Sequence, residues 1–430
     1  MNHVLGLKCV LCGAEYGVDE VLYVCPRHGD EGILDVIYDY ERIRPRLTRE
    51  RLAADPTPSI WRYLPLLPVD PVTLDSLRNG TLPTHPLFRV GWTPLYRARN
   101  LERKLGLAEL YVKDDGRNPS ASFKDRASAV GILKALELGR DVIAAASTGN
   151  AASSLATLSA SVGIRNIIFV PAAAPQAKIA QLLIYGAQVL AVKGTYDQAF
   201  DLCLVAAREF DWYSRNTAYN PYLSEGKKTA ALEICEQLGW RAPDRIFVGV
   251  GDGCIIGGLW KGLRDLLALG LIDRMPKLMG VQAEGSQAMA KAWREGIPPE
   301  QMTPQPAETI ADSIAAGLPR DRVKAMRAVQ ETDGAYIAVS DKEILAAMKE
   351  LARGAGVFAE PAGSAPYAGL VKAREQGLVG DDERVVVIAT GNGLKDVASA
   401  MKATGEPYRI PPEIEAVRKW VSGGKGSATA

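Results

Sequence analysis

The stretch Asn118-Pro119-Ser120-Ala121-Ser122-Phe123-Lys124-Asp125-Arg126 joins a turn to the beginning of a helix. Asn-Pro favours a turn, and a helical pattern runs from Ala127 to Leu138 directly afterwards. Lys124 is therefore expected near a helix N-terminus, where unpaired N–H groups and the dipole disfavour a second positive charge. Such an amine loses its proton more easily, as it must before forming a Schiff base with an aldehyde. By itself the stretch fits an ordinary solvated lysine better, so the rest of the chain has to decide.

Short apolar strands alternate with helical segments on both sides of this stretch. The predicted strands are Glu109–Lys113, Val142–Ala146, Asn166–Val170, Gln188–Val192, Arg245–Val250, Lys277–Gln282 and Arg384–Ala389. The predicted helices are Leu101–Leu105, Ala151–Val162, Lys178–Tyr185, Tyr196–Phe210, Thr229–Leu238, Gly257–Leu269, Val323–Gln330, Asp341–Arg353 and Ala365–Glu375. Alternation at this spacing implies βαβ units, so the predicted fold class is α/β with parallel, doubly wound sheets.

Three of the predicted strands end in loops that suit an anion or a cofactor. Ser147-Thr148-Gly149-Asn150-Ala151 offers backbone N–H groups and two hydroxyls in front of a helix. Val250-Gly251-Asp252-Gly253-Cys254-Ile255-Ile256-Gly257-Gly258 is a glycine turn that can close around a phosphate. Ala389-Thr390-Gly391-Asn392-Gly393-Leu394-Lys395-Asp396 follows the last strand. Each of the first two loops alone is a common strand–helix turn, and only their combination is informative.

Together these segments resemble the fold type II enzymes that use pyridoxal 5′-phosphate (PLP), the group related to tryptophan synthase β. Within that family, Ser-Phe-Lys-Asp-Arg at 122–126 and Thr-Gly-Asn-Gly-Leu-Lys-Asp at 390–396 are most similar to the threonine synthases. The resemblance implies two doubly wound open-sheet domains. We expect a large PLP-binding domain from 86–131 and 217–412, a small α/β domain inserted at 132–216, and a tail at 413–430.

The resemblance also implies which residues bind the cofactor and the substrate. Lys124 would hold PLP as a Schiff base, Asn150 would bond its 3′-oxygen, and Thr390 would offer a hydroxyl to the pyridine nitrogen. The phosphate cradle would consist of Gly251, Asp252, Gly253, Cys254 and Ile255. The substrate α-carboxylate would lie at Ser147, Thr148, Gly149 and Ala151. The side chain of Asp252 is awkward beside a dianion, so it must point away or cap the helix.

The substrate side departs from the family. Threonine synthases usually read Asn-Pro-x-Arg-x-Glu-Gly-x-Lys-Thr, and Leu223 stands here in the place of the arginine that helps bind the phosphate of O-phosphohomoserine. We expect Lys227 to bind substrate, and one of Lys227, Lys228 and Arg320 to replace the missing arginine. The alternative is that Lys227 and Lys228 are ordinary solvated residues at the start of the next helix. The implied function is threonine synthase. The alternatives are a PLP-dependent ammonia-lyase of serine or threonine, and a PLP-binding regulatory protein without turnover.

The N-terminal region has the spacing of a zinc site. Cys9-x2-Cys12 is followed after twelve residues by Cys25-x2-His28, and three thiolates with one imidazole suit tetrahedral zinc. The alternative is a β-hairpin without metal. Many threonine synthases carry a similar small ribbon, so we expect a zinc-ribbon-like module at 1–38. At 39–85 we expect a linker, with one short helix near Tyr40–Ala54 and an extended remainder.

The composition is that of an ordinary globular enzyme. The chain has 430 residues, of which 47% are hydrophobic and 23% charged, with a formal net charge of +1. This charge balance indicates neither nucleic acid nor membrane as a partner. No apolar run reaches the roughly 18–20 residues that span a bilayer. We expect a cytoplasmic homodimer acting on a small amino-acid substrate, with Cys203, Cys235 and Cys254 reduced. Gly423–Ala430 is small and polar and is expected to be disordered.

Overall fold

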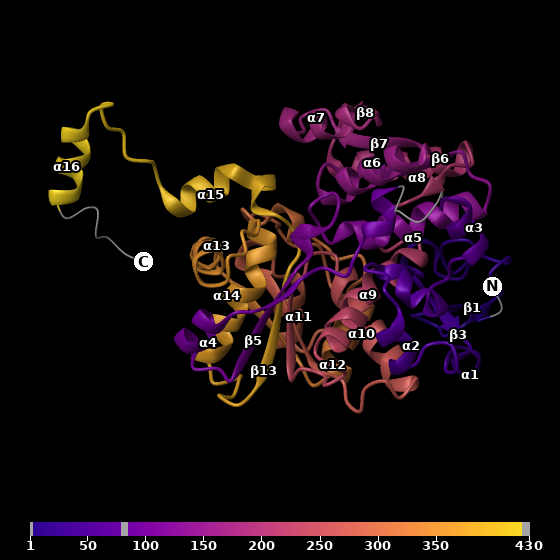
Figure 1. Ribbon diagram of the computed structural model, residues 1–430. Helices are drawn as coiled ribbons and strands as arrows, with labels where there is room; N and C mark the ends of the chain where they lie inside the picture. Colours follow the sequence, from indigo (N-terminus) through magenta and orange to yellow (C-terminus); the bar gives the residue numbers. More distant parts are fainter. Residues whose placement is uncertain (1–2, 79–84, 424–430) are drawn as a thin grey trace.

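The computed structural model describes residues 3–78 and 85–423, which form three β-sheets and the helices packed on them (Figure 1). The strands are β1 (Val4–Cys9), β2 (Glu15–Tyr16), β3 (Leu34–Tyr38), β4 (Leu95–Arg97), β5 (Glu109–Asp114), β6 (Val142–Ala146), β7 (Arg165–Pro171), β8 (Gln188–Val192), β9 (Tyr213–Ser214), β10 (Arg245–Gly249), β11 (Lys277–Ala283), β12 (Ala335–Val339) and β13 (Arg384–Ala389). Within these residues, no helix is both long and apolar enough to cross a membrane.

The helices come mostly between consecutive strands, as βαβ connections require. They are α1 (Tyr40–Ile43), α2 (Arg49–Ala54), α3 (Pro71–Ser76), α4 (Arg99–Leu105), α5 (Lys124–Glu137), α6 (Asn150–Val162), α7 (Gln176–Ile184), α8 (Tyr196–Glu209), α9 (Tyr222–Gln237), α10 (Cys254–Ala268), α11 (Ala288–Glu295), α12 (Arg322–Glu331), α13 (Asp341–Ala355), α14 (Pro361–Glu375), α15 (Val397–Thr404) and α16 (Ile414–Ser422). The mixed α/β fold confirms the predicted fold class.

The largest sheet has six strands in the order β12-β11-β10-β13-β5-β4. All of its pairs are parallel except β4 with β5, at one edge. Helices α4, α13 and α14 cover one face, and α10 and α12 pack on the other (Figure 1). Strand β5 comes from the N-terminal half and pairs with β13 near the C-terminus, so both ends of the sequence build this sheet.

The second α/β sheet is smaller and entirely parallel, in the order β8-β7-β6-β9. Helix α8 packs on one face, while α5 and α6 contact the other. Helix α5 also packs along α9, which in turn lies on α10 of the larger sheet. Helix α5 therefore connects the two α/β halves, and its N-terminus reaches the space between them (Figure 1).

The N-terminal module is an antiparallel sheet in the order β2-β1-β3, and it is docked on both α/β halves. The hydroxyl of Tyr38 donates to Glu225 Oε2 at 2.7 Å on α9. The hydroxyl of Tyr23 accepts from the backbone N–H of Ser214 at 2.8 Å, at the end of β9. The module is thus part of the packed body and shares its main hydrophobic core.

The expectation of a mostly extended linker after this module is wrong. Residues 40–76 form α1, α2, a 3₁₀ segment at Ile60–Leu66 and α3, and the side chains of Trp61, Tyr63 and Leu66 are buried in the main core. Arg62 also ion-pairs with Glu236 at 2.5 Å. The sequence lacks a sustained helical period here because the segment is divided into four short elements.

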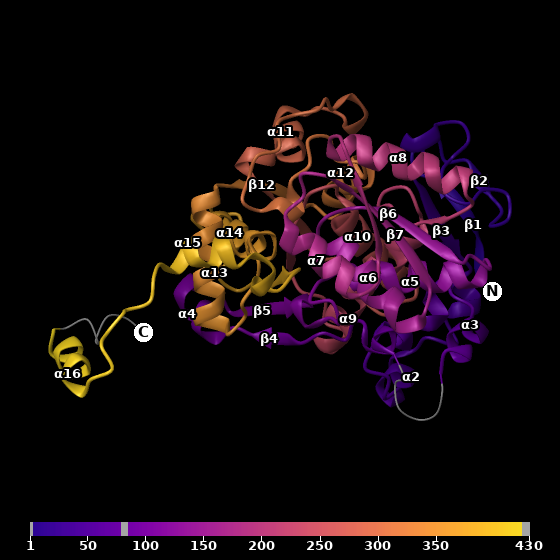
Figure 2. The ribbon, with the colours of Figure 1, turned by 90° about the horizontal axis from the view of Figure 1, so that it is seen from above.

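The C-terminal region departs from the compact body after α15. Figures 1 and 2 both place α16 away from the rest of the chain, at the end of an extended segment. Of the predicted disordered stretch Gly423–Ala430, only Gly423 lies among the described residues.

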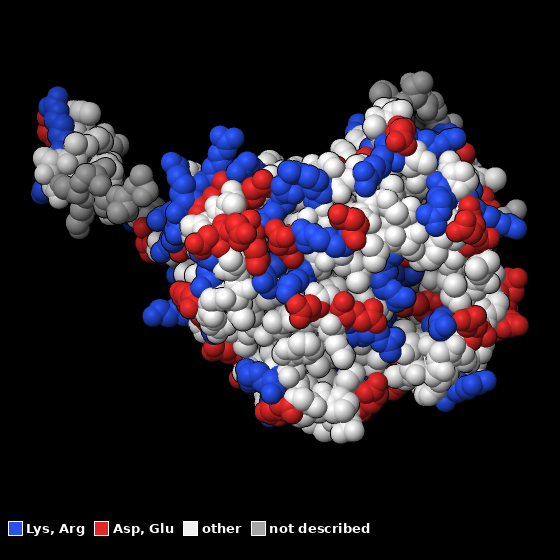
Figure 3. Space-filling view, turned by 90° about the horizontal axis from the view of Figure 1, so that it is seen from below, with Lys and Arg blue, Asp and Glu red and all other residues white. Residues whose placement is uncertain are grey.

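On the face seen from below, acidic and basic side chains are interspersed and neither gathers into one patch (Figure 3).

Candidate active site

Lys124 is the first residue of α5 and lies at the carboxyl edge of the larger sheet. The chain leaves β5 through a 3₁₀ turn at Asp115–Arg117, and the N–H of Phe123 donates to the carbonyl of Thr390 at 2.8 Å. This bond fixes the start of α5 beside the end of β13. The side chain of Lys124 is half-buried and makes no hydrogen bond or ion pair within the described structure. It is therefore an amine held in place by its helix and still free to react.

The surroundings of Lys124 favour the neutral amine. Burial, followed by the positive charges of Lys227 and Arg215, lowers the pKa of Lys124 to about 8. An amine with an ordinary pKa of 10.5 would be almost fully protonated at pH 7, at about one neutral group in three thousand. At a pKa of about 8 the neutral share is about one tenth. The sequence predicted easier deprotonation of Lys124 from the helix dipole alone. The structure adds two further causes of the lowered pKa, burial of the side chain and the charges of Lys227 and Arg215.

The N-terminus of α10 is an open anion cradle close to Lys124. No side chain caps this helix, and within 3–78 and 85–423 no acceptor is found for the N–H groups of Asp252, Gly253, Cys254 or Ile255. Gly253 has φ +92°, which favours glycine, and a Cβ at Gly251 would lie 2.9 Å from the backbone of Ile314. Uncapped amides at the positive end of a helix dipole fit a phosphate.

Asp252 is turned out of this cradle. Its Oδ1 accepts from the N–H of Arg320 at 3.3 Å, and its carbonyl accepts from Asp321 at 2.8 Å. The carboxylate thus fixes the neighbouring loop and does not cap α10. Of the two orientations expected from the sequence, the structure has the one that points away.

Asn150, the first residue of α6, faces a glutamate that the sequence motifs did not single out. Its Nδ2 donates to Glu360 Oε1 at 2.7 Å and to Ser313 Oγ at 3.4 Å. Burial and the nearby carboxylate of Asp312 raise the pKa of Glu360 to about 7. Glu360 precedes Pro361 at the start of α14, and a glutamate before a helix-initiating proline is the only sequence signal for it. The pair closes one side of the space above Lys124.

The other predicted polar groups lie around the same space with their hydroxyls available. Thr390 follows β13 and is 8% exposed, and its hydroxyl has no partner in the described residues. Ser147 follows β6, and its hydroxyl accepts from the N–H of Gly149 at 3.2 Å, which shapes the loop. Thr148 and Ala151 belong to the same loop and first turn. Helices α5, α6, α10 and α14 thus present their N-termini to one site, where negatively charged ligands are favoured.

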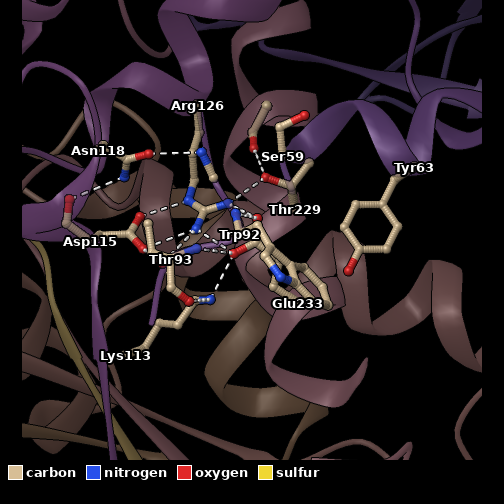
Figure 4. Close-up of polar contacts among 12 residues, drawn as sticks. Ser59, Tyr63, Trp92, Thr93, Lys113, Asp115, Asn118, Arg126, Thr229 and Glu233 are labelled. Atoms are coloured by element: carbon tan, nitrogen blue, oxygen red, sulfur yellow. Dashed lines mark hydrogen bonds and ion pairs between the residues drawn. The ribbon is translucent and has the colours of Figure 1, made fainter. Parts of the chain in front are cut away.

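A buried ion network holds the lysine helix in place (Figure 4). Arg126 contacts Asp115 and Glu233, each at 2.6 Å, and Lys113 contacts Glu233 at 2.7 Å. All four side chains are fully buried. A Cβ at Gly226 of α9 would overlap the carbonyl of Arg126, so the two helices meet at the closest possible distance. The network connects α5, α9 and β5 directly behind Lys124.

The candidates for binding a substrate phosphate are not equivalent. Lys227 is 1% exposed, and its Nζ donates to Thr217 Oγ1 at 2.9 Å, beside Lys124. Lys228 points the other way and contacts Glu225 at 2.6 Å and Asp265 at 2.7 Å, so its expected role is wrong. The guanidinium of Arg320 lies 3.8 Å from the centre of the Phe200 ring. Leu223 is fully buried against Gly131.

The four predicted metal ligands meet in the N-terminal module. The ligand atoms of Cys9, Cys12, Cys25 and His28 all lie within 4.8 Å of one another. Cys12 Sγ is 3.9 Å from Cys25 Sγ, which in turn is 3.5 Å from His28 Nδ1. Tetrahedral zinc with the usual bond lengths separates two sulfurs by about 3.8 Å, and a sulfur and a nitrogen by about 3.6 Å. The donor set and its spacing therefore fit zinc.

Comparisons with known proteins agree with this geometry. The family described as "Pyridoxal-phosphate dependent enzyme" matches residues 87–391. The chain is 42% identical to the threonine synthase of Methanocaldococcus jannaschii over 96% of this chain and 98% of that protein. It is also 42% identical to the threonine synthase of Methanosarcina acetivorans over 97% and 98% of the two chains.

Solved structures share the fold at lower sequence identity. The processed form of threonine deaminase isoform 2 from Solanum lycopersicum has a TM-score of 0.61 and 23% identity, covering 73% of this chain and 87% of that chain. At this identity the likeness concerns the fold alone.

Proposed function

The chain belongs to the pyridoxal-phosphate dependent enzymes and, among them, to the threonine synthases, and we propose that it converts O-phospho-L-homoserine and water to L-threonine and phosphate. The observation that carries the proposal is the similarity to threonine synthases over nearly the full length of both chains. In this reaction the bond between Cγ and the phosphate oxygen breaks, one proton leaves Cβ and one joins Cγ. The hydroxyl group of water joins Cβ, and the other proton of water leaves with the phosphate.

The proposed cofactor site is the space above Lys124. The free amine, the uncapped start of α10 and the unpartnered hydroxyl of Thr390 fit the aldehyde, the phosphate and the pyridine nitrogen of PLP respectively. Bound PLP supplies an electron sink that makes protons on the amino acid removable. The Lys124 amine would move protons among the substrate carbons, and the Ser147–Ala151 loop would bind the substrate carboxylate. Asn150 would bond the cofactor's 3′-oxygen beside Glu360.

An assay with three substrates tests the proposed reaction. The purified protein, supplied with PLP, is incubated separately with phosphohomoserine, threonine and serine, and phosphate and oxo-acid are measured. We expect equal amounts of phosphate and threonine from phosphohomoserine and little oxo-acid from the other two. Oxo-acid from threonine or serine, with no phosphate released from phosphohomoserine, would mean that the chain is an ammonia-lyase.

We also propose that the N-terminal module binds about one zinc ion per chain through Cys9, Cys12, Cys25 and His28. The close fit of the sulfur and nitrogen distances to tetrahedral zinc supports this. We assign the metal a structural role, because the module contacts α9 and β9 through Tyr38 and Tyr23 and shares the main hydrophobic core.

Removing the metal should lower stability more than catalysis. A strong chelator should lower the thermal unfolding midpoint measurably, while kcat of the protein that remains folded changes less than about twofold. Cys9→Ala with Cys12→Ala should reduce zinc to near zero in metal analysis, and Cys235→Ala, a buried cysteine outside the cluster, serves as the control. Full zinc content in the double variant would contradict this assignment.

A further inference from the structure

The most completely buried cations of the chain fall into two groups. Lys113, Arg126, Arg215, Lys227, Lys228 and Lys324 are at most 2% exposed. Lys113, Arg126, Lys228 and Lys324 each contact a carboxylate at 2.5–2.7 Å. Arg215 and Lys227 do not have such a partner anywhere in the described part of the chain. Burying an unpaired charge is costly, so these two cations require an explanation.

Arg215 is fixed by the smaller sheet and directed towards hydroxyls. It directly follows β9, and its N–H donates to the carbonyl of Ala144 on β6 at 2.8 Å. Its Nε and Nη2 both donate to Ser128 Oγ at 3.1 Å, which leaves Nη1 without a partner among the residues described. Asp125 attracts the guanidinium only from beyond ion-pair distance. A planar fork held in this way is ready to bind an anion.

Lys227 approaches the same region from α9. Its only hydrogen bond within the described residues goes to the hydroxyl of Thr217, and Asp321 attracts it from beyond ion-pair distance. Burial, and the charge of Arg215 in addition, lower the pKa of Lys227, and both cations lower the pKa of Lys124. Hydrogen bonds bring the three cations together: Lys227 contacts Thr217, two residues after Arg215, and Arg215 contacts Ser128, one helical turn after Lys124 on α5. Within the described residues, neither Arg215 nor Lys227 is ion-paired there, so both can bind an anion.

We propose that Arg215 and Lys227 form a binding site for a phosphate dianion, which takes the γ-phosphate of the substrate and the orthophosphate that leaves it. This inference rests on the proposed function for the identity of the substrate. Leu223 packs against Gly131 where the related enzymes have an arginine, so Arg215 and Lys227 supply the missing charge from other positions. The Ser147–Ala151 loop follows β6, the strand to which Arg215 is bonded, so the substrate's carboxylate and phosphate would bind side by side.

A matched pair of lysine variants separates this role from a structural one. Lys227→Met and Lys228→Met change neighbouring, equally buried residues of α9, of which only Lys228 is ion-paired. In the PLP-loaded protein without phosphate, Lys228→Met should lower the unfolding midpoint. Lys227→Met should leave it unchanged or raise it, because an unpaired buried charge is removed. Added inorganic phosphate should stabilise the wild type and Lys228→Met, but not Lys227→Met.

Binding and kinetics then test Arg215. Calorimetric titration of the PLP-loaded protein with inorganic phosphate should show affinity about tenfold or more weaker in Arg215→Leu and Lys227→Met. KM for phosphohomoserine should rise by a similar factor, whereas PLP content stays at the wild-type level. Arg215→Lys should recover part of the affinity, and Arg208→Leu, on the surface, should have none of these effects.

The outcomes distinguish this inference from the proposed function. Unchanged phosphate affinity in both Arg215→Leu and Lys227→Met would contradict the proposed phosphate site. If these variants lose PLP while their phosphate affinity is unaltered, the two cations bind the cofactor and the proposal is also wrong. If the wild type binds inorganic phosphate through these residues but releases none from phosphohomoserine, the site stands and the threonine synthase reaction fails.

Discussion

Replacing Lys124 by alanine should abolish threonine formation, lowering kcat by about a thousandfold or more. The side chain is half-buried, has no partner in the described structure, and carries an amine whose pKa is lowered to about 8. Its loss therefore removes a reactive group but no hydrogen bond or ion pair within the described residues. The unfolding midpoint should stay within the range of a surface control such as Lys104→Ala.

The covalent bond to PLP gives a second measurement. Borohydride treatment followed by peptide mapping should attach the cofactor to Lys124 in the wild type and to no lysine in Lys124→Ala. In the wild-type apoprotein, the rate of Schiff-base formation should rise with pH, reach half of its maximum near pH 8 and level off about one unit higher, since only the neutral amine reacts and half of the amine is neutral at its pKa. A reducible cofactor in Lys124→Ala would overturn the assignment.

Replacing Arg126 by methionine should destabilise the protein by about 3–5 kcal/mol, as loss of one partner from a buried ion pair does. Asp115 and Glu233 would remain fully buried after each loses two hydrogen bonds from the guanidinium (Figure 4). Because the network also holds the start of α5, the yield of folded, PLP-loaded protein should fall as well. Chemical denaturation of the loaded protein measures the effect.

The control for this variant is a cation whose ion pair is exposed to solvent. Arg274→Met removes a contact of 2.7 Å with Asp244, in which both side chains are more than a third exposed, and should change stability by less than about 1 kcal/mol. Equal effects of the two substitutions would mean that burial of the Arg126 network contributes nothing to the free energy of unfolding.

A homodimeric assembly and a cytoplasmic location stay predictions.

The sequence by itself determined the regular elements and the lysine motif. Strands β6, β8 and β13 begin and end at the predicted residues, because each is a short apolar run closed by turn-forming residues. The helix at Lys124 and the close approach of the four zinc ligands were also predictable, since both depend on residues near one another in sequence. The strand β12 and the helix α11 were not predicted, although β12 is a short apolar run of the same kind.

Only the tertiary structure decided which charges meet. Helix α9 begins at Tyr222, earlier than predicted, because its polar first turns are buried against α5 and α10. That packing directs Lys227 to the site and Lys228 to Glu225 and Asp265, although the two residues are adjacent in sequence. The side chains around Arg215 and Glu360 also come from segments that are far away in the sequence. Burial and electrostatic partners depend on contacts made across the whole chain, and local sequence patterns do not encode them.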